Sequence, residues 1–498
     1  MSRVGLVAMT RDDWSVATGC PTPRCGATAL RAVRIGAAAM AVAAALWAPL
    51  PAAAQTLTDT LIAAYRNSNL LDQNRALLRA ADEDVATAIA ALRPVVNFVA
   101  RAEGVNAQTE VGGQALGNAT LPSTTVRNRD LSAQIALSGE ITVFDFGRNQ
   151  LAVQAAEAQV LATRSALVGV EQQVLLNAVA AFMELRAAIA TLDLREANVR
   201  LITQELQAAR DRFEVGEITR TDVSIAEARL AGARSQLAAA EGDVAVAREA
   251  YRAATGVDPG QLAPPPALPA LPARLQDAQG VARDRHPAIR QARHEVSAAD
   301  LNAERAAAEG RGSVTGSVNL SVDDDRRDRS TVGLSYSRPL YTGGRNPALV
   351  RRAIAQRDAS RANLHQVTVE VLEEVAGAWS GIAVSRAQIE ASERQIEAAQ
   401  TAFEGVSQEA ELGARTTLDV LDAEQELLDA RVDRVQAETG RTLAAYRLLA
   451  SMGLMTVEHL DLGIPTYDPE AYFNLVRNAP KRSLQGERLD RVLERLQP

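Results

Sequence analysis

Residues 213–223 read FEVGEITRTDV, and residues 410–420 read AELGARTTLDV. The two stretches carry a glycine, a threonine and an aspartate at the same places, 197 residues apart. The same interval separates the triplet GRN at 147–149 from its recurrence at 344–346. Because one interval holds over so long a stretch, the sequence contains an internal duplication, and its fold has to be built from two similar halves.

The duplication sets the domain organisation. Residues 55–258 form the first repeat, residues 259–273 a proline-rich linker, and residues 274–455 the second repeat. Residues 456–498 are expected to form a C-terminal periplasmic tail. Each repeat has the same internal order, which is a helix, two segments of alternating polarity, a very long helix and a returning helix.

The expected helices account for most of each repeat. Apolar residues make up 47% of the chain but aromatic ones only 3%, a balance that suits long helices packed side by side rather than a globular core. An opening helix is expected near 56–92 and again near 275–309. The long and returning helices follow at 148–213, 219–255, 347–411 and 416–452.

Apolar residues recur every seven positions along both long helices. The first helix carries Leu185, Leu192, Val199 and Leu206, and the second carries Ile382, Ile389, Ile396 and Phe403 at the equivalent places. This spacing is typical of coiled-coil packing along a sustained seam. Taken by itself, the pattern favours a structural coiled coil.

Two segments of alternating polarity separate the opening helix from the long one in each repeat. Residues 313–322 read SVTGSVNLSV, with apolar residues on one face and polar residues on the other, and 331–338, 96–104 and 132–143 alternate likewise. Each segment is near the length of a tilted strand that spans a membrane. A soluble sheet with one wet face is the alternative. Against it, the flanking helices use their apolar faces on one another.

Strands in a bilayer cannot leave their edges open, and four strands are too few to close a membrane barrel. The chain is therefore expected to oligomerise and to share a barrel between protomers. Two chains would supply eight strands and three would supply twelve, and the strands alone do not choose between them. The polar connections at 106–130 and 323–329 are expected to face the cell exterior.

Residues 1–54 read as a secretory signal peptide. Arg31 and Arg34 precede an apolar run at 35–48, and a small-residue cleavage pattern ends at Ala54. Both cysteines of the chain lie in this leader, so the mature protein is expected to have neither a disulfide nor a lipid anchor.

Enzyme and nucleic-acid functions find no support in the residues. The four histidines show no metal-ligand spacing, and no nucleophile motif, P-loop or dinucleotide fingerprint is present. No basic stripe accompanies the net charge of −8, which argues against nucleic acid as a partner. We expect no catalytic residues, no metal site and no cofactor.

Several motifs together resemble the TolC family of outer-membrane factors. They are FDFGR at 144–148 and PLYTGG at 339–344, where strands pass into helices, and the two turn motifs at 213–223 and 412–422. The resemblance covers residues 56 to about 455. It implies a mostly α fold with a small β part, in which long antiparallel helical hairpins form a tunnel and four strands per chain join a trimeric outer-membrane β-barrel.

The resemblance also implies a function. A homotrimer in the outer membrane, in contact with lipid and extending into the periplasm, would be the exit duct of a tripartite efflux pump or a type I secretion system. A periplasmic adaptor (membrane fusion protein) and an inner-membrane ABC or proton-driven transporter would open it at its periplasmic tip. A periplasmic adaptor or a structural coiled-coil protein of the envelope is the alternative, but neither accounts for both the duplication and the strands.

Residues near the two turns are the candidate site. Thr219 and Thr416 fit the start of a returning helix, and an acid three residues on, Asp222 or Asp419, completes a capping box. Two charges lack a counterpart in the first repeat, because Arg415 stands where that repeat has Ile218, and Asp422 where it has Ile225.

By the resemblance, these charges close or line the tip. Asp222, Thr221 and Arg415 are assigned to tip closure, with Arg415 pairing with Asp222 of the same or a neighbouring protomer. Asp419 and Asp422 share one helix face, and in a trimer they would form an acidic ring that favours cations. The capping box explains Asp419, but nothing in the sequence explains Asp422.

The turns themselves match the family's adaptor contacts. The residues concerned are Val215, Gly216, Leu412 and Gly413. Each glycine also has a structural explanation, because it allows the left-handed end of a helix, and the two roles are compatible. One departure is Ala410, which stands where the family archetype has a tyrosine and which leaves room for a differently built closure.

Overall fold

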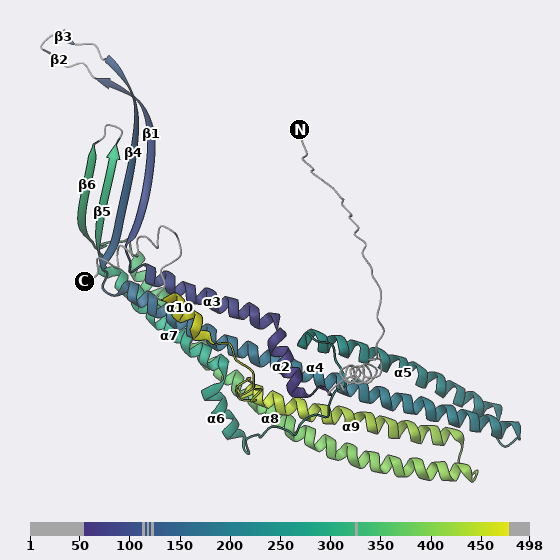
Figure 1. Cartoon of the computed structure of the whole chain (residues 1–498). Helices are drawn as coiled ribbons and strands as arrows, with labels where there is room; N and C mark the ends of the chain where they lie inside the picture. The colour runs from purple at the N-terminus through teal and green to yellow at the C-terminus, as the bar shows by residue number, and fades with distance from the viewer. Residues whose placement is uncertain (1–53, 112–114, 117–118, 121–123, 324–326, 478–498) are drawn as a thin grey trace, which may run out of the picture. The chain divides into compact units, whose positions relative to one another are not determined.

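The computed structural model describes residues 54–111, 115–116, 119–120, 124–323 and 327–477, all within one compact unit. The predicted signal peptide lies outside the described residues except for Ala54, as do residues 478–498 of the predicted tail. The described chain is mostly helical, with one antiparallel sheet, and the two repeats follow the same order of elements (Figure 1).

Each repeat opens with two short helices rather than the single one expected. They are α2 (Leu57–Asn67) and α3 (Asn69–Ala90) in the first repeat, and α6 (Leu275–Arg285) and α7 (Pro287–Ala308) in the second. Ser68 leaves the helical conformation, and its hydroxyl accepts a hydrogen bond from the Leu71 N–H. His286 is extended because it precedes Pro287, which disfavours the α conformation before it. The expectation of one continuous opening helix is therefore wrong in both repeats.

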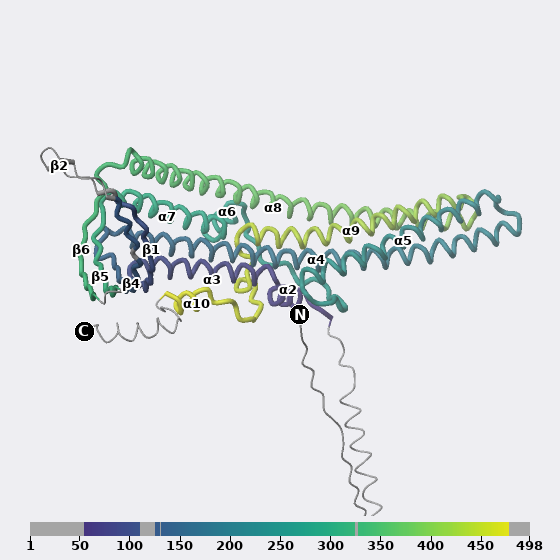
Figure 2. Tube along the Cα trace, turned by 90° about the horizontal axis from the view of Figure 1, so that it is seen from above, coloured from purple at the N-terminus to yellow at the C-terminus, as the bar shows by residue number. Residues whose placement is uncertain are grey.

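Two very long helices carry most of the chain. Helix α4 (Arg148–Glu214) and helix α8 (Arg345–Glu411) each have 67 residues, so each spans about 100 Å. Helix α5 (Arg220–Thr255) returns against α4, and helix α9 (Thr417–Ser451) returns against α8. The two hairpins run in the same direction and end together, far from the sheet (Figure 2).

The passage from strand to long helix explains the FDFGR motif. Phe146 and Gly147 both adopt a positive φ, of 57° and 82°. Asp145 is buried, and its carboxylate accepts hydrogen bonds from the N–H groups of Gly147 (3.1 Å) and Asn149 (2.7 Å). The carboxylate therefore satisfies free donors at the start of α4 and favours the positive end of that helix.

The main core lies midway along α4, where elements of both repeats meet. Phe182, Tyr251 and Leu448 are fully buried there, each from a different helix. Helix α4 is also the one described helix long and apolar enough to cross a membrane by length and composition, with 44% of that window buried. Its apolar character here has a packing explanation, because Val174, Leu175, Ala178, Val179 and Phe182 all belong to this core.

The sheet has the strand order β1-β4-β5-β6, with every neighbouring pair antiparallel. The strands are β1 (Val95–Val111), β4 (Thr124–Phe144), β5 (Ser313–Asp323) and β6 (Asp328–Ser337). Strands β4 and β5 pair with each other, so the two repeats share one sheet. The first pair is longer than expected, and a small pair, β2 (Ala115–Leu116) and β3 (Ala119–Thr120), extends beyond it.

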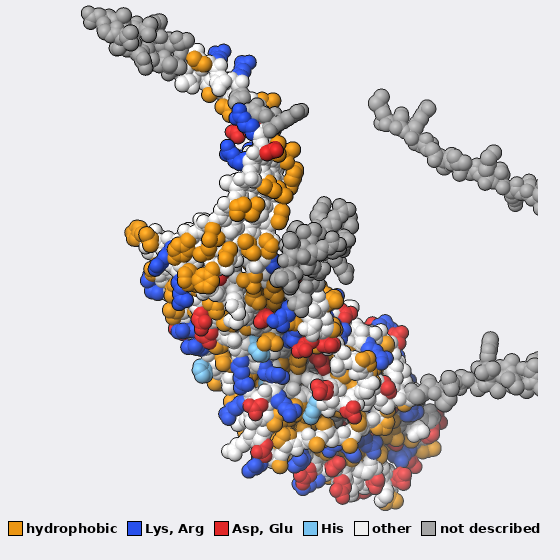
Figure 3. All heavy atoms as spheres, turned by 60° about the vertical axis from the view of Figure 1, so that its left-hand side comes forward, with side chains coloured by type: hydrophobic (Ala, Val, Ile, Leu, Met, Phe, Trp, Pro, Cys, Tyr) orange, Lys and Arg blue, Asp and Glu red, His pale blue; other side chains and the backbone are white. Residues whose placement is uncertain are grey.

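One face of the sheet is apolar and exposed. Val332, Leu334 and Tyr336 of β6 are 81%, 72% and 57% exposed, and Leu131 of β4 is 75% exposed. Apolar side chains gather over the strands, whereas charged side chains of both signs cover the helices (Figure 3). Within the described part of the chain, β1 and β6 each pair along one edge only. The sheet therefore presents an uncovered apolar face and two open edges.

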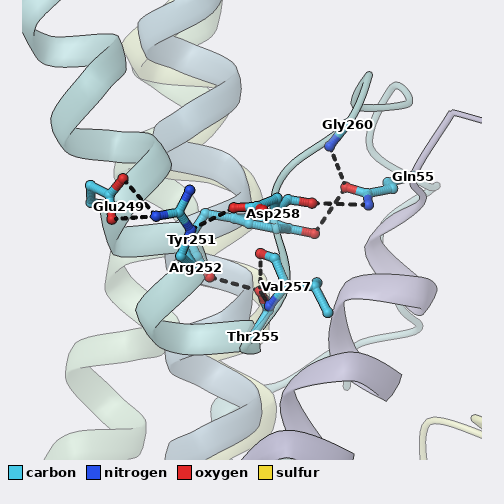
Figure 4. A network of polar contacts seen from close by, with 8 residues as sticks. All are labelled: Gln55, Glu249, Tyr251, Arg252, Thr255, Val257, Asp258 and Gly260. Atoms are coloured by element: carbon cyan, nitrogen blue, oxygen red, sulfur yellow. Dashed lines mark hydrogen bonds and ion pairs between the residues drawn. The ribbon is translucent and has the colours of Figure 1, made fainter. Parts of the chain in front are cut away.

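Hydrogen bonds tie the start of the described chain to the linker between the repeats (Figure 4). The Gln55 N–H donates to the Gln261 carbonyl (2.7 Å), and the Gln55 side-chain oxygen accepts from the Gly260 N–H (2.9 Å). The Tyr251 hydroxyl of α5 also reaches that oxygen, at 3.3 Å. Residue 55 thus links the opening of the first repeat, its returning helix and the linker.

The return helix of each repeat ends against the break in its opening helices. A Cβ on Gly256 would lie 2.7 Å from the Asn67 side chain, and a Cβ on Gly453 would lie 2.7 Å from the His286 Cα. Both glycines have a positive φ, of 72° and 78°. The duplication therefore extends to this close approach, which only glycine permits.

The start of the expected tail packs along the helices. Helix α10 (Pro469–Arg477) contacts α3 and lies beside it (Figure 2). The Arg75 guanidinium stacks on Tyr467, and Arg164 stacks on Phe473 and pairs with Glu470 at 3.3 Å. Up to residue 477, the C-terminal segment is thus fastened to the first repeat.

Candidate functional site

The two hairpins end in turns of the same construction. Gly216 and Gly413 have positive φ values of 83° and 76°. The N–H of the next residue reaches back to the helix in both, from Glu217 to the Arg212 carbonyl and from Ala414 to the Glu409 carbonyl. These bonds satisfy carbonyls that the helix end leaves free. Both glycines therefore have the structural role that the sequence predicted.

The apolar residue before each glycine projects from the tip. Val215 is 72% exposed and Leu412 is 85% exposed. Little protein of the same chain therefore covers either apolar side chain. The structure thus brings Val215, Gly216, Leu412 and Gly413 to one end of the molecule, on two adjacent turns.

A cavity of about 530 Å³ separates the two turns. Its lining includes Arg212, Asp222, Ala410 and Arg415, together with the turn residues Leu412 and Gly413. Asp222 and Arg415 therefore face one space, from opposite hairpins. Ala410, which stands where the family archetype has a tyrosine, also lines this space. Thr221 lies beside it, exposed on the first turn of α5.

Arg415 and Asp222 are each engaged within their own hairpin. The Arg415 Nε donates to Glu409 Oε2 at 2.8 Å, and this hydrogen bond and charge raise the pKa of Arg415. The Asp222 carboxylate accepts hydrogen bonds from the N–H and hydroxyl of Thr219, at 2.9 and 2.8 Å. Within one protomer the structure thus brings Arg415 and Asp222 to the same cavity without pairing them.

Asp419 and Asp422 differ in their surroundings. Asp419 completes the capping box of α9, and hydrogen bonds from the Thr416 N–H and hydroxyl lower its pKa. Asp422 forms an ion pair with Arg229 of α5, at 2.5 Å. The expectation that Asp422 has no structural partner is therefore wrong: its carboxylate links the second hairpin to the first. The sequence could not reveal this link because the two residues are 193 positions apart.

The contact between the hairpins continues away from the tip as a mixed seam. A small apolar cluster contains Ile202, Leu206, Ala226, Leu230 and Ala233 of the first repeat and only Leu421 of the second. Farther along, Arg195 of α4 approaches Asp429 of α9 at 3.8 Å. The seam therefore combines apolar packing, to which Leu421 of the second repeat contributes, with polar pairs between the hairpins.

A buried amide–carboxyl pair also lies on this seam, outside the set of residues predicted from the sequence. The Asn198 Nδ2 of α4 donates to Glu424 Oε1 of α9 at 2.5 Å, and these residues are only 4% and 6% exposed. Burial raises the pKa of Glu424 to about 7, with the Asn198 hydrogen bond opposing the shift and the charge of Glu205 adding to it. One signal was present: the Ala-Glu pair at 423–424 repeats the pair at 226–227.

Among the described residues, no group of three or more histidine, cysteine, aspartate or glutamate side chains is placed to hold a metal ion. His286 is half-buried, and this burial lowers its pKa to about 4; its Nδ1 accepts a hydrogen bond from the Ala288 N–H at the start of α7. This histidine has a structural role.

Comparison with known families matches both repeats. The sequence model described as "Outer membrane efflux protein" matches residues 60–257 and 280–454, which are the two repeats without the linker. The outer membrane efflux protein BepC of Brucella suis is 34% identical over 438 residues, covering 86% of this chain and 91% of BepC. The outer membrane protein TolC of Escherichia coli is 26% identical over 58% of this chain and 63% of TolC.

Solved structures share the fold. Those of CusC, described in terms of transmembrane channel formation, superpose with a TM-score of 0.69, at 21% identity over 80% of this chain and 92% of CusC. The outer membrane protein VceC of Vibrio cholerae superposes with a TM-score of 0.67, at 22% identity over 80% of this chain and 96% of VceC. Helical hairpins and a partial sheet in this arrangement are thus a known channel architecture.

Proposed function

The chain belongs to the outer membrane efflux protein family, and from this membership we propose that three copies assemble into one duct from the periplasm through the outer membrane. Membership gives the coarser statement directly: the chain is an outer-membrane channel protein that extends into the periplasm and serves as an exit duct for efflux or secretion. Members of the family are channels rather than enzymes, and we assign no reaction to this chain.

The open sheet is the observation that carries the proposal of a shared barrel. Four strands of this kind are unsuited to water, because their apolar face is exposed, and to lipid, because their two edges leave backbone groups without hydrogen bonds. Closure requires β6 of one copy to pair with β1 of the next. Three copies supply twelve strands, enough for a barrel with an open interior.

Aromatic and apolar residues support a membrane boundary at the strand-to-helix passages. Leu340 and Tyr341 are 90% and 89% exposed, and the rings of Phe144 and Phe146 pack edge to face at 4.8 Å. Exposed aromatic side chains collect where lipid meets water. This boundary would leave the connections between β1 and β4 and between β5 and β6 outside the cell, and all the long helices in the periplasm.

The adaptor and the transporter would bind at the periplasmic tip, where the two hairpins end. We assign Val215, Gly216, Leu412 and Gly413 to contact with a periplasmic adaptor, because they are exposed on adjacent turns at the end most distant from the membrane. An inner-membrane ABC or proton-driven transporter would complete the assembly. Relatives are named for secretion and for metal resistance, as an alkaline protease secretion protein and as a cobalt-zinc-cadmium resistance protein.

Channel recording with an Arg415 variant tests this function. The purified protein should form trimers in detergent crosslinking and channels of low resting conductance in planar bilayers. Arg415→Ser should raise that conductance severalfold, because it removes a cation from the cavity between the turns, where Asp222 also lies. Asp222→Ala should do the same.

Arg394→Ser is the matched control, because Arg394 is an exposed arginine of α8 that also pairs with a glutamate, four residues away. Its conductance should remain at the wild-type value. Unchanged conductance in both tip variants would remove Arg415, Asp222 and the neighbouring Thr221 from tip closure, and a functional monomer would contradict the duct itself.

The proposed acidic ring of Asp419 and Asp422 predicts opposite effects of two substitutions on cation block of the channel. In a trimer these carboxylates converge, and multivalent cations added on the periplasmic side should block the channel. Asp422→Ala should weaken the block by roughly fivefold, the factor that about 1 kcal/mol of charge interaction supplies. Arg229→Ala should strengthen the block, because Arg229 neutralises Asp422 in the same chain.

Both variants break the same ion pair, so a purely structural role would move them in the same direction. Block by the trivalent hexamminecobalt ion is the measurement, and opposite shifts are the expected result. If the two variants shift the block equally, or not at all, Asp422 serves only to join the hairpins and the ring does not select ions.

A further inference from the structure

The seam between the hairpins holds both apolar and polar contacts where the proposed duct has to open. Helix α9 contacts α4 and α5 of the first repeat along this seam. In the apolar cluster there, Leu421 is the one contribution of the second repeat. Polar pairs between the hairpins therefore act beside this apolar packing in holding the two repeats together.

The Asn198–Glu424 pair is the most buried of these polar contacts. Asn198 Nδ2 and Glu424 Oε1 are bonded to each other. The other polar atom of each side chain, Asn198 Oδ1 and Glu424 Oε2, is buried and lacks a hydrogen-bond partner among the described residues. When the carboxyl group is ionised, both of these oxygen atoms can only accept hydrogen bonds. A proton on Oε2 supplies the donor that Oδ1 lacks, and amide and carboxylic acid can then be joined by two hydrogen bonds.

No charged group on the helices packed around Glu424 pairs with its carboxyl group, among the residues that the structure describes. On α4, Glu205 repels it, and Arg195 is directed to Asp429 and Gln236. On α5, Arg229 is engaged with Asp422. On α8, Glu411 acts on Glu205. The arginines of the seam thus pair with other carboxylates, and the Glu424 carboxyl meets an amide and a like charge.

We propose that Asn198 and Glu424 form a second closing contact of the duct, inside each protomer, which must separate and take up water when the hairpins part. The contact closes fully when Glu424 carries a proton and loosens when it does not. Glu424 is thereby a gating residue distinct from the tip residues Arg415 and Asp222. This inference rests on the proposed function, since it assumes that the hairpins separate to open a channel.

The direction of the pH effect follows from the two states. In the closed seam the pKa of Glu424 is raised to about 7 by burial, whereas in an open, hydrated seam it returns toward its ordinary value of 4.5. The closed seam thus binds the proton more tightly, so its advantage is full below pH 4.5 and is lost as the pH rises to about 7. Within that window the closed-to-open ratio falls by up to about tenfold per pH unit in each protomer.

The duplication provides the matched comparison. Glu227 occupies in the first repeat the place of Glu424 in the second. Its side chain is 50% exposed and pairs with Arg210 at 2.6 Å, so it meets a cation in water where Glu424 meets an amide in the protein interior. Glu227→Gln therefore removes an acid from the same repeat position without touching the buried pair.

A cysteine in the apolar cluster reports opening directly. Ala226 is fully buried, and the only cysteines of the chain, Cys20 and Cys25, lie in the predicted leader. In the full-length trimer carrying Ala226→Cys, maleimide labelling should accelerate between pH 5.5 and 7.5 by about tenfold more than labelling of an exposed reference cysteine at Val246. Adding Glu424→Gln should remove this extra acceleration, so that labelling follows the reference cysteine at every pH, because the glutamine amide supplies the missing donor permanently.

Two further variants fix the interpretation. Asn198→Asp should label faster than the wild type at pH 7.5, because two carboxylates then share the buried site. Glu227→Gln should keep the wild-type pH profile. An unchanged pH profile in Glu424→Gln would overturn the proposal, as would a probe that never labels while the channel conducts. Failure to form any channel or trimer would instead contradict the proposed function, so the two failures are distinguishable.

Discussion

Gly453→Ala is expected to prevent accumulation of the folded, heat-resistant oligomer. The added Cβ would lie 2.7 Å from the His286 Cα and 2.9 Å from the Arg285 carbonyl oxygen, which are backbone atoms at the break between α6 and α7. It would also sit on a residue with a φ of 78°. The left-handed conformation costs about 1–2 kcal/mol and the clash about 1–3 kcal/mol, together a large share of a typical folding free energy.

Gly463→Ala separates the two contributions. Gly463 also has a positive φ, of 65°, but a Cβ there meets nothing within 4 Å. That variant should lose only the conformational part and still assemble. Thermal dissociation of the oligomer, followed on gels at increasing temperature, measures both. Equal stability of the two variants would show that the opening helices can move away from the end of α9.

Leu334→Arg is expected to block insertion of the assembled protein into the outer membrane. Leu334 lies in the middle of β6, 72% exposed on the apolar face of the sheet. A lipid-facing arginine near the middle of a membrane strand costs about 2–4 kcal/mol, and each trimer would carry three copies. Membrane fractionation should find the variant outside the outer-membrane fraction.

Ser335→Arg is the control on the opposite face of the same strand. Successive residues of a strand point to opposite faces, so this arginine would project into the barrel interior and tolerate water. The variant should insert normally and change only conductance. If Leu334→Arg inserted as well as Ser335→Arg, the exposed apolar face would have to be covered by protein rather than lipid.

The sequence predicted the repeated parts of the fold well, because each helix, strand and turn pattern occurs once in each repeat. The four long and returning helices, the four alternating segments and both capping boxes recur at the expected places. The opening helices differ from the prediction because Ser68 caps a new helix in the first repeat, and because Pro287 disfavours the helical conformation of His286 in the second. Helical periodicity continues across such breaks and does not reveal them.

The candidate site was predicted only where it is local. Capping residues and the left-handed glycines follow from spacing within a few residues, and the structure bears them out. The pairs Arg229–Asp422 and Asn198–Glu424 join different repeats, across 193 and 226 positions. No periodicity within one helix indicates which residue of another helix it meets, so these contacts had to come from the structure.

The open edges of the sheet have a genetic consequence. One edge of the sheet belongs to β1 and the other to β6, so each chain in the ring pairs with a neighbour on both sides. A chain with a damaged strand therefore disturbs the barrel at any position in the ring. In a cell that expresses intact and strand-damaged chains equally, and in which the damaged chains still join the ring, only roughly one trimer in eight contains intact chains alone. Mutations that spoil the barrel after assembly should therefore be dominant, whereas mutations that prevent a chain from folding at all should be recessive.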